Sequence, residues 1–130
     1  AMEQRKLTCW MSFSCRDAQH ICEGTPIAEC AEFLQEQDRV EAIGINCTAP
    51  EWIEGLIREV RRVSDKPIIV YGNSGEIYDP REKVWKGAPC GMAYSAWAPR
   101  WYAAGANIIG GCCRTGPADI SQIRAWRDSL

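Results

Sequence analysis

Three cysteines of this chain lie where a parallel α/β protein carries its chemistry. Cys47 directly follows the apolar segment 40–46, and Cys112 and Cys113 follow the apolar segment 107–110. If both segments are strands of one parallel sheet, the loops after them meet at the same end. Three thiolates suit a tetrahedral Zn²⁺ and leave its fourth position open. A substrate thiol bound there would be held as the nucleophilic thiolate, which is chemistry for group transfer.

Spacing alone leaves other interpretations of these residues open. Cys112 and Cys113 could pack as small apolar side chains, or form a vicinal disulfide or a redox pair. The glycines at 110 and 111, ahead of a helix that starts with Pro117, could instead hold a phosphate. The chain has no Cys-x-x-Cys pair and no His-x-x-x-His, so a zinc ribbon or a zincin is not expected.

The elements that must position these residues alternate along the chain. Apolar runs predict strands over 7–13, 40–46, 68–71 and 107–110, whereas three- and four-residue spacing predicts helices over 26–37, 50–63, 94–104 and from 117 onward. The segment 75–93 contains Pro and Gly throughout and is interpreted as one long loop. Thr48 and Glu51 have the spacing of a capping box. Four strand–helix units predict a parallel sheet in a single α/β domain over 1–130.

Composition excludes several kinds of partner. Fifteen Lys and Arg against seventeen Asp and Glu give a net charge of −2, without the basic excess of a protein that binds nucleic acid or anionic lipid. The apolar runs are too short to span a membrane, and segment 1–6 lacks the apolar core of an export signal. We therefore expect a cytoplasmic protein with no nucleic-acid or membrane partner. Its eight cysteines are expected as thiols or metal ligands more often than as disulfides.

The sequence resembles the C-terminal part of the homocysteine S-methyltransferase family over roughly residues 7–125. The two most specific motifs are Gly-Ile-Asn-Cys, which ends at Cys47, and Gly-Gly-Cys-Cys-Arg-Thr, which contains Cys112 and Cys113. The matching segments are 10–13, 17–20, 24–26, 42–47, 67–71, 73–76, position 85 and 105–115. Gly72 departs from the family pattern, where Pro commonly precedes the asparagine, and Gly116 replaces a more usual Thr.

This resemblance implies an architecture and a reaction. The fold would be the C-terminal (βα)4 half of a TIM (β/α)8 barrel, with Zn²⁺ bound by Cys47, Cys112 and Cys113. Asn73 would supply an amide that can approach the zinc before homocysteine arrives. The implied enzyme transfers a methyl group from S-methylmethionine or S-adenosylmethionine to the zinc-bound thiolate of homocysteine, giving methionine. The alternative is a truncated zinc- or homocysteine-binding remnant without turnover.

The length of the chain adds an expectation about partners. A (β/α)8 barrel takes about 250 residues, and a half-barrel leaves two open sheet edges. We therefore expect either a homodimer or a complementing N-terminal half-barrel as a partner, beside homocysteine and a sulfonium methyl donor.

Several further residues have both a functional and a structural interpretation. Arg114 could bind a substrate carboxylate or cap the end of its strand. Glu76 could bind the ammonium group of a donor, although an exposed turn acid is commoner. Trp10 and Trp85 could border a pocket for a cationic sulfonium. His20 is the only histidine and is expected to be structural rather than catalytic. The residues interpreted as packing or non-ligand side chains are Trp52, Trp101, Trp126, Cys9, Cys15, Cys22, Cys30 and Cys90.

Overall fold

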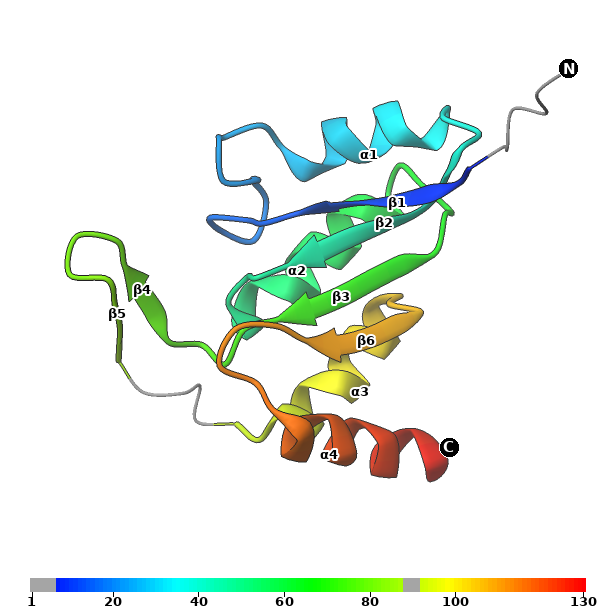
Figure 1. The fold of residues 1–130 in the computed structure, drawn as a ribbon. Coiled ribbons are helices and arrows are strands. Elements are labelled where there is room, and N and C mark those ends of the chain that lie inside the picture. The colour runs from blue at the N-terminus through cyan, green and yellow to red at the C-terminus, as the bar shows by residue number, and fades with distance from the viewer. Residues whose placement is uncertain (1–6, 88–91) are drawn as a thin grey trace, which may run out of the picture.

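The structure is a computed structural model that describes residues 7–87 and 92–130. Four of its strands form one sheet, and the helices lie on one side of that sheet (Figure 1). The elements in chain order are β1 (Cys9–Phe13), α1 (Ile27–Gln35), β2 (Val40–Asn46), α2 (Pro50–Arg61), β3 (Ile68–Gly72), β4 (Ile77–Asp79), β5 (Val84–Lys86), α3 (Tyr94–Ala104), β6 (Ile108–Gly111) and α4 (Pro117–Asp128).

The four-stranded sheet has the order β1-β2-β3-β6, and every neighbouring pair is parallel. Each strand is joined to the next strand of the sheet through at least one helix, as parallel pairing requires. The predicted parallel α/β fold is therefore confirmed. Its centre is the pairing of Ile43 with Ile68 and of Ile45 with Val70, and all four side chains are fully buried under the helices.

Helix α2 shows why the sequence pattern was a reliable guide there. Its residues Ile53, Leu56, Ile57 and Val60 recur at three- and four-residue intervals, and none of them is exposed. The predicted capping box is wrong, because Thr48 does not cap this helix. The buried Thr48 hydroxyl instead donates to the carbonyl of Asn46 and accepts the backbone N–H of Cys15, which joins two strand ends.

Helix α3 continues through Pro99 and covers the other half of the sheet. Its Trp101 is fully buried and packs edge-on against Tyr94, with ring centroids 5.4 Å apart. Gly105 ends the helix with φ of 123°, a conformation that favours glycine. Trp52 and Trp126 are half-buried against the same core, in agreement with their interpretation as packing residues.

The interpretation of 75–93 as one long loop is wrong. Strands β4 and β5 form an antiparallel hairpin in which Tyr78 lies opposite Trp85, with ring centroids 5.3 Å apart. Each strand has only three residues, too few for alternation to be recognised in the sequence, and this aromatic pair is a contact of the kind that stabilises hairpins. Cys90 lies outside the described residues.

The side of the sheet that faces away from the helices is exposed at its two outer strands. Trp10 on β1 is 57% exposed and Ile108 on β6 is 55% exposed, although both residues lie on strands. These two strands also form the outer edges of the sheet (Figure 1). Among the described helices, none combines the length and apolar character that crossing a membrane would need.

Candidate metal centre

The three cysteines lie at the carboxyl end of the sheet, on loops that are joined through β3. The N–H of Cys47 donates to the carbonyl of Tyr71, and the N–H of Cys112 donates to the carbonyl of Gly72, at 3.1 and 2.8 Å. The carbonyl of Cys113 in turn accepts the N–H of Ser74. Strand β3 therefore holds the β2 and β6 loops in register, as the position of the cysteines in a parallel sheet predicts.

The sulfur atoms of Cys47, Cys112 and Cys113 all lie within 4.8 Å of one another and are half-buried. The Sγ of Cys113 is 3.7 Å from that of Cys47 and 3.9 Å from that of Cys112. Cys47 and Cys112 are joined as a disulfide, with Cα atoms 5.7 Å apart. The structure therefore pairs two distant cysteines, whereas the sequence favoured thiols and left a vicinal pair as an alternative.

Two residues of this site have a strained backbone. Cys47 has φ of 47° and Arg114 has φ of 64°, in the left-handed region that non-glycine residues rarely adopt. Such a conformation is disfavoured by about 1–2 kcal/mol per residue. Cys47 is held there by its bond to Tyr71 and by the adjacent buried Thr48, so the surrounding structure aims its sulfur at the other two.

Arg114 and Glu76 pair with each other across the site. The Nε of Arg114 lies 3.1 Å from a carboxylate oxygen of Glu76, whose other contact is the Ser74 hydroxyl at 2.8 Å. The Arg114 guanidinium, and then the Ser74 hydroxyl, hold the pKa of Glu76 below its ordinary value. The pair links the loop after β3 to the loop after β6. The two side chains are thus each other's ion-pair partners in this structure.

A cavity of about 310 Å³ opens beside Cys47. It extends past Asn73, whose side-chain oxygen accepts the N–H of Gly75, to the β4–β5 hairpin. None of the described lining residues is Lys, Arg or His, so acids and aromatic rings set its character. Trp10 does not line it. The acidic and aromatic lining residues are Glu51, Glu76, Trp52, Tyr78 and Trp85.

Cys15 reaches the same cavity but has a different environment from the three clustered cysteines. Burial raises the pKa of its thiol to about 12, against a smaller opposing effect of the Thr48 hydroxyl. It therefore stays a neutral thiol at physiological pH, which suits the predicted rim or core role. Cys9 and Cys22 are exposed and Cys30 is half-buried, and none of these belongs to the sulfur cluster.

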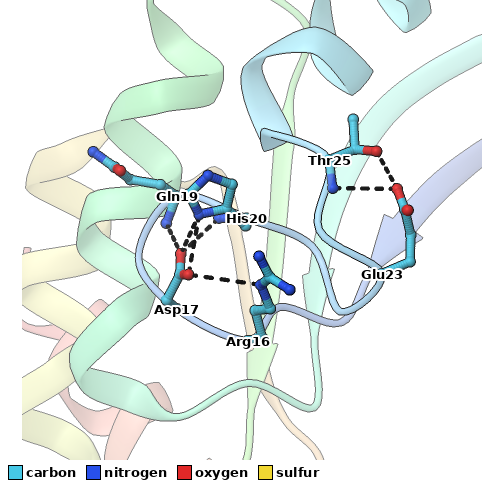
Figure 2. Close-up of polar contacts among 6 residues, drawn as sticks. All are labelled: Arg16, Asp17, Gln19, His20, Glu23 and Thr25. Atoms are coloured by element: carbon cyan, nitrogen blue, oxygen red, sulfur yellow. Dashed lines mark hydrogen bonds and ion pairs between the residues drawn. The ribbon is translucent and has the colours of Figure 1, made fainter.

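His20 is part of a hydrogen-bonded loop after β1 (Figure 2). Its Nδ1 lies 2.9 Å from the carboxylate of Asp17, which also accepts the backbone N–H groups of Gln19 and His20. These bonds, led by that from Gln19, lower the pKa of Asp17. His20 does not line the cavity at Cys47, so its position agrees with the structural role expected for it. Glu23 and Thr25 close the end of the same loop.

The phosphate interpretation of the Gly110-Gly111 loop finds no support. The N-terminus of α4 already has an anion, because the N–H of Gly116 donates to the carboxylate of Asp119 at 2.8 Å. The N–H of Cys112 is likewise bonded to Gly72.

Two side chains support the cysteine loops in roles that the sequence did not predict, although Thr115 ends the motif around Cys112 and Cys113. The buried Tyr94 hydroxyl lies 2.9 Å from the carbonyl of Gly72 and 3.0 Å from that of Gly110, and its single hydrogen is shared between them. Thr115 donates to the carbonyl of Cys112 at 2.7 Å. Tyr94 carries no local signal of this role, because its partners are 22 and 16 residues away.

Fold and site together define a class of protein: a parallel α/β sheet that gathers three cysteine sulfurs at the carboxyl ends of its strands. The family model described as homocysteine S-methyltransferase matches residues 1–126. The chain therefore belongs to the homocysteine S-methyltransferase family, of which it represents the C-terminal portion with the cysteine cluster.

Similar proteins support this assignment over only part of their own length. The chain is 52% identical over 121 residues to homocysteine S-methyltransferase YbgG of Bacillus subtilis, covering 93% of this chain and 38% of the relative. It is 42% identical over 120 residues to a selenocysteine Se-methyltransferase of Brassica oleracea, covering 91% of this chain and 35% of that protein. The chain thus spans between a third and two-fifths of the length of these curated relatives.

The homocysteine methyltransferase MmuM of Escherichia coli has a similar structure. Its oxidised form matches with a TM-score of 0.72 at 36% identity, over 91% of this chain and 36% of that chain. Its metallated form matches with a TM-score of 0.72 at 34% identity, over 91% and 35%.

Proposed function

We propose that this chain is the zinc-bearing half of a homocysteine S-methyltransferase. Cys47, Cys112 and Cys113 would bind Zn²⁺, and the reaction would move a methyl group from S-methylmethionine or S-adenosylmethionine to homocysteine, giving methionine. The observation that carries this proposal is the gathering of three sulfurs within 4.8 Å in a chain of this family.

The sulfur geometry fits a zinc ion. Two sulfurs bound at 2.3 Å with a tetrahedral angle lie about 3.8 Å apart. The distances from the Cys113 sulfur to those of Cys47 and Cys112 are 3.7 and 3.9 Å. Zinc ligation requires Cys47 and Cys112 as thiolates rather than as the disulfide of this structure. The proposed site is therefore functional in its reduced form.

Zinc held by three thiolates would favour the thiolate form of a further thiol at its open position. The homocysteine sulfur would then be the nucleophile, and its lone pair would form the new bond to the methyl carbon of the donor. The bond between that carbon and the sulfonium sulfur would break, and its electron pair would stay on the departing sulfur, which would leave as a neutral thioether. The reaction thus neutralises one positive and one negative charge.

The residues around the cavity suit a cationic donor. Glu51, at the start of α2, offers a carboxylate, and Trp52 and Trp85 offer aromatic faces to a positive sulfur. Asn73 lies on the same wall, where its amide could approach the open position of the metal before homocysteine does. The Glu76–Arg114 ion pair would keep the two cysteine-bearing loops together rather than bind substrate.

We further propose that the sheet forms half of an eight-stranded barrel, as a single partial domain over residues 1–130. The four parallel strands with helices on one side support this, because a TIM barrel repeats that unit eight times. The open edges would pair with a complementing half, either a second copy of this chain or an N-terminal half-barrel.

A remnant that binds zinc or homocysteine without turnover is the second candidate function. It is favoured by one observation, the coverage of only 38% of the Bacillus subtilis relative.

Elemental analysis of reduced protein tests the proposal. We expect about one zinc per chain, lost in Cys113→Ser and retained in the control Cys22→Ser, whose exposed thiol lies outside the cluster. Zinc content that Cys113→Ser leaves unchanged would refute the metal site. Methionine formed from homocysteine and S-methylmethionine, with no second chain present, would refute the remnant.

A further inference from the structure

The two outer edges of the sheet are open and unlike each other. Strand β1 pairs only with β2 and strand β6 only with β3, so each has one side whose backbone N–H and C=O groups meet no strand among the described residues. Exposed strand edges of this kind are pairing surfaces unless they are blocked. Strand β6 has the sequence Ile-Ile-Gly-Gly, so neither a proline nor a bulge blocks its open side.

The β1–α1 edge is apolar with acidic side chains. Met11 and Phe13 of β1 form a groove with Phe33 and Glu29 of α1, and Phe33 is 68% exposed. Glu36 follows Glu29 by seven residues, two helical turns along the same side of α1. Among the described residues neither carboxylate has an ion-pair partner.

The β6–α4 edge is apolar with basic side chains. Ile109 of β6 forms a groove with Ile120, Arg124 and Arg127 of α4. Both arginines contact one acid, Asp128, at 3.5 and 2.6 Å, so the three side chains together keep a positive charge. This edge therefore opposes the first edge in charge while sharing its apolar floor.

The two edges also match in level. Helices α1 and α4 both follow strands of one parallel sheet, so both begin at the carboxyl end of the strands. Height along each helix can be compared by counting residues from its first residue. On this count Ile120 of α4 is level with Cys30 of α1. Arg124 is level with Phe33–Leu34, and Arg127 is level with Glu36–Gln37. Parallel packing of α4 beside α1 would thus place Arg124 and Arg127 near Glu36, and Ile120 next to the apolar groove.

We propose that a second copy of this chain closes the barrel. The β6–α4 edge of each copy pairs with the β1–α1 edge of the other, and one two-fold axis relates the two contacts. The pairing gives eight parallel strands and covers Trp10 and Ile108, the exposed residues on the open face. It also places a second sheet over the cavity beside Cys47, which is bounded by one chain here. Beyond the half-barrel geometry, nothing in this inference depends on zinc or on methyl transfer.

Sedimentation equilibrium of reduced, metal-free protein tests this association. We expect a mass twice the 14.6 kDa of the chain. One variant reverses the basic edge, Arg124→Glu with Arg127→Glu, and a second reverses the acidic edge, Glu29→Arg with Glu36→Arg. Each variant alone juxtaposes like charges at both contacts, so its dimerisation should weaken by at least about tenfold.

Mixing the two variants is the sharper measurement. A mixed dimer contains one chain of each variant. At one contact its introduced glutamates face its introduced arginines, and at the other contact the native charges face each other. We therefore expect the dimer mass to return in the mixture. The matched control is Arg58→Glu with Arg62→Glu, which makes the same charge change on exposed residues in the last turn and at the C-cap of the central helix α2. It should stay dimeric.

Three results would overturn the proposal: wild-type protein that remains at 14.6 kDa, a dimer that neither reversal weakens, or variants that fail to restore each other when mixed. Far-UV circular dichroism of each variant shows that its fold is retained. A wild-type monomer that associates only with the N-terminal part of a full-length relative would identify that part as the occupant instead. Because the protein is metal-free here, loss of zinc binding or of turnover would count against the proposed function alone.

Discussion

The two faces of the four-stranded sheet differ in how deeply their largest side chains are buried. On the face under the helices, Ile43, Ile45, Ile68 and Val70 are fully buried. On the opposite face, Trp10 and Ile108 are each more than half exposed. The strands are the same, and alternate residues along each strand supply the two faces.

This difference suggests a division of roles: one face stabilises the single chain, and the other is free to contact a partner. Burial of apolar area under the helices stabilises the single chain, since each buried large side chain contributes roughly 1.5–3 kcal/mol. The uncovered face contributes little to a single chain and is available for a partner. The predictions below test that division, beginning with the largest expected effect.

Trp101→Ala should lower the free energy of unfolding by about 3–5 kcal/mol, because Trp101 is fully buried against Tyr94 and Trp97. Trp10→Ala on the open face should lower the free energy of unfolding by less than about 1 kcal/mol. Urea denaturation measures both, in the Arg124→Glu, Arg127→Glu background and at low protein concentration, so that association contributes least. Equal losses at the two tryptophans would remove the distinction between the faces.

Gly111→Ala should disturb the metal site more than the core. A Cβ at Gly111 would lie 2.9 Å from the Cβ of Thr115, so the Thr115 bond to Cys112 would break. We expect the free energy of unfolding to fall by about 1–3 kcal/mol and zinc binding to weaken by at least about tenfold. The matched control is Gly116→Ala, where nothing lies within 4 Å of the new Cβ. Competition with a zinc chelator measures the affinity, and similar affinity in both variants would contradict this prediction.

Tyr94→Phe leaves the carbonyls of Gly72 and Gly110 without their shared hydroxyl. Removing a buried hydrogen-bond partner lowers stability by about 1–3 kcal/mol. Because Gly72 also accepts the N–H of Cys112, the absorption spectrum of a cobalt-substituted site should shift as well. Tyr102→Phe, at a ring that is 54% exposed, is the control and should change neither quantity. A variant with lower stability and an unshifted spectrum would restrict Tyr94 to a packing role.

Glu76→Gln should have the smallest effect, and that effect should depend on pH. The folded pKa of Glu76 lies below the ordinary 4.5, so its ion pair with Arg114 stabilises the fold above pH 4.5. That contribution is lost as pH falls through the folded pKa. The difference in stability between wild type and variant should therefore be present at pH 7 and vanish in acid. Thermal melts across this range measure it, and a difference that persists in acid would contradict the assignment.

Asp79→Asn is the control for that pH dependence. Lys86 lowers the pKa of Asp79 in the same direction, but the pair lies on the β4–β5 hairpin and contacts none of the clustered cysteines. Both substitutions should reduce the free energy of unfolding at pH 7 and leave it unchanged in acid. Only Glu76→Gln should also weaken zinc binding.

Local pattern was sufficient for α2, which buries one face, and for β2, which is a mostly apolar run. The helix periodicity of 50–63 anticipated α2 at Pro50–Arg61, and the apolar run 40–46 anticipated β2 at the same bounds. The Thr48 capping box failed because a buried hydroxyl took distant partners, and the hairpin at 77–86 was missed because its strands are too short for a pattern. Contacts that join residues far apart in sequence leave no local periodicity to detect.

The sequence by itself determined the order of strands and helices, and with it the end of the sheet at which Cys47, Cys112 and Cys113 lie, because the carboxyl ends of parallel strands meet at one side. Only the tertiary structure decided which sulfurs touch, that Arg114 pairs with Glu76, and that Tyr94 supports the ends of β3 and β6. It alone brought the acidic α1 and the exposed arginines of α4 to opposite edges of one sheet (Figure 1). The physical reason is that side-chain partners depend on backbone separations of a few ångströms, which are set by packing of the whole chain and not by any segment of it.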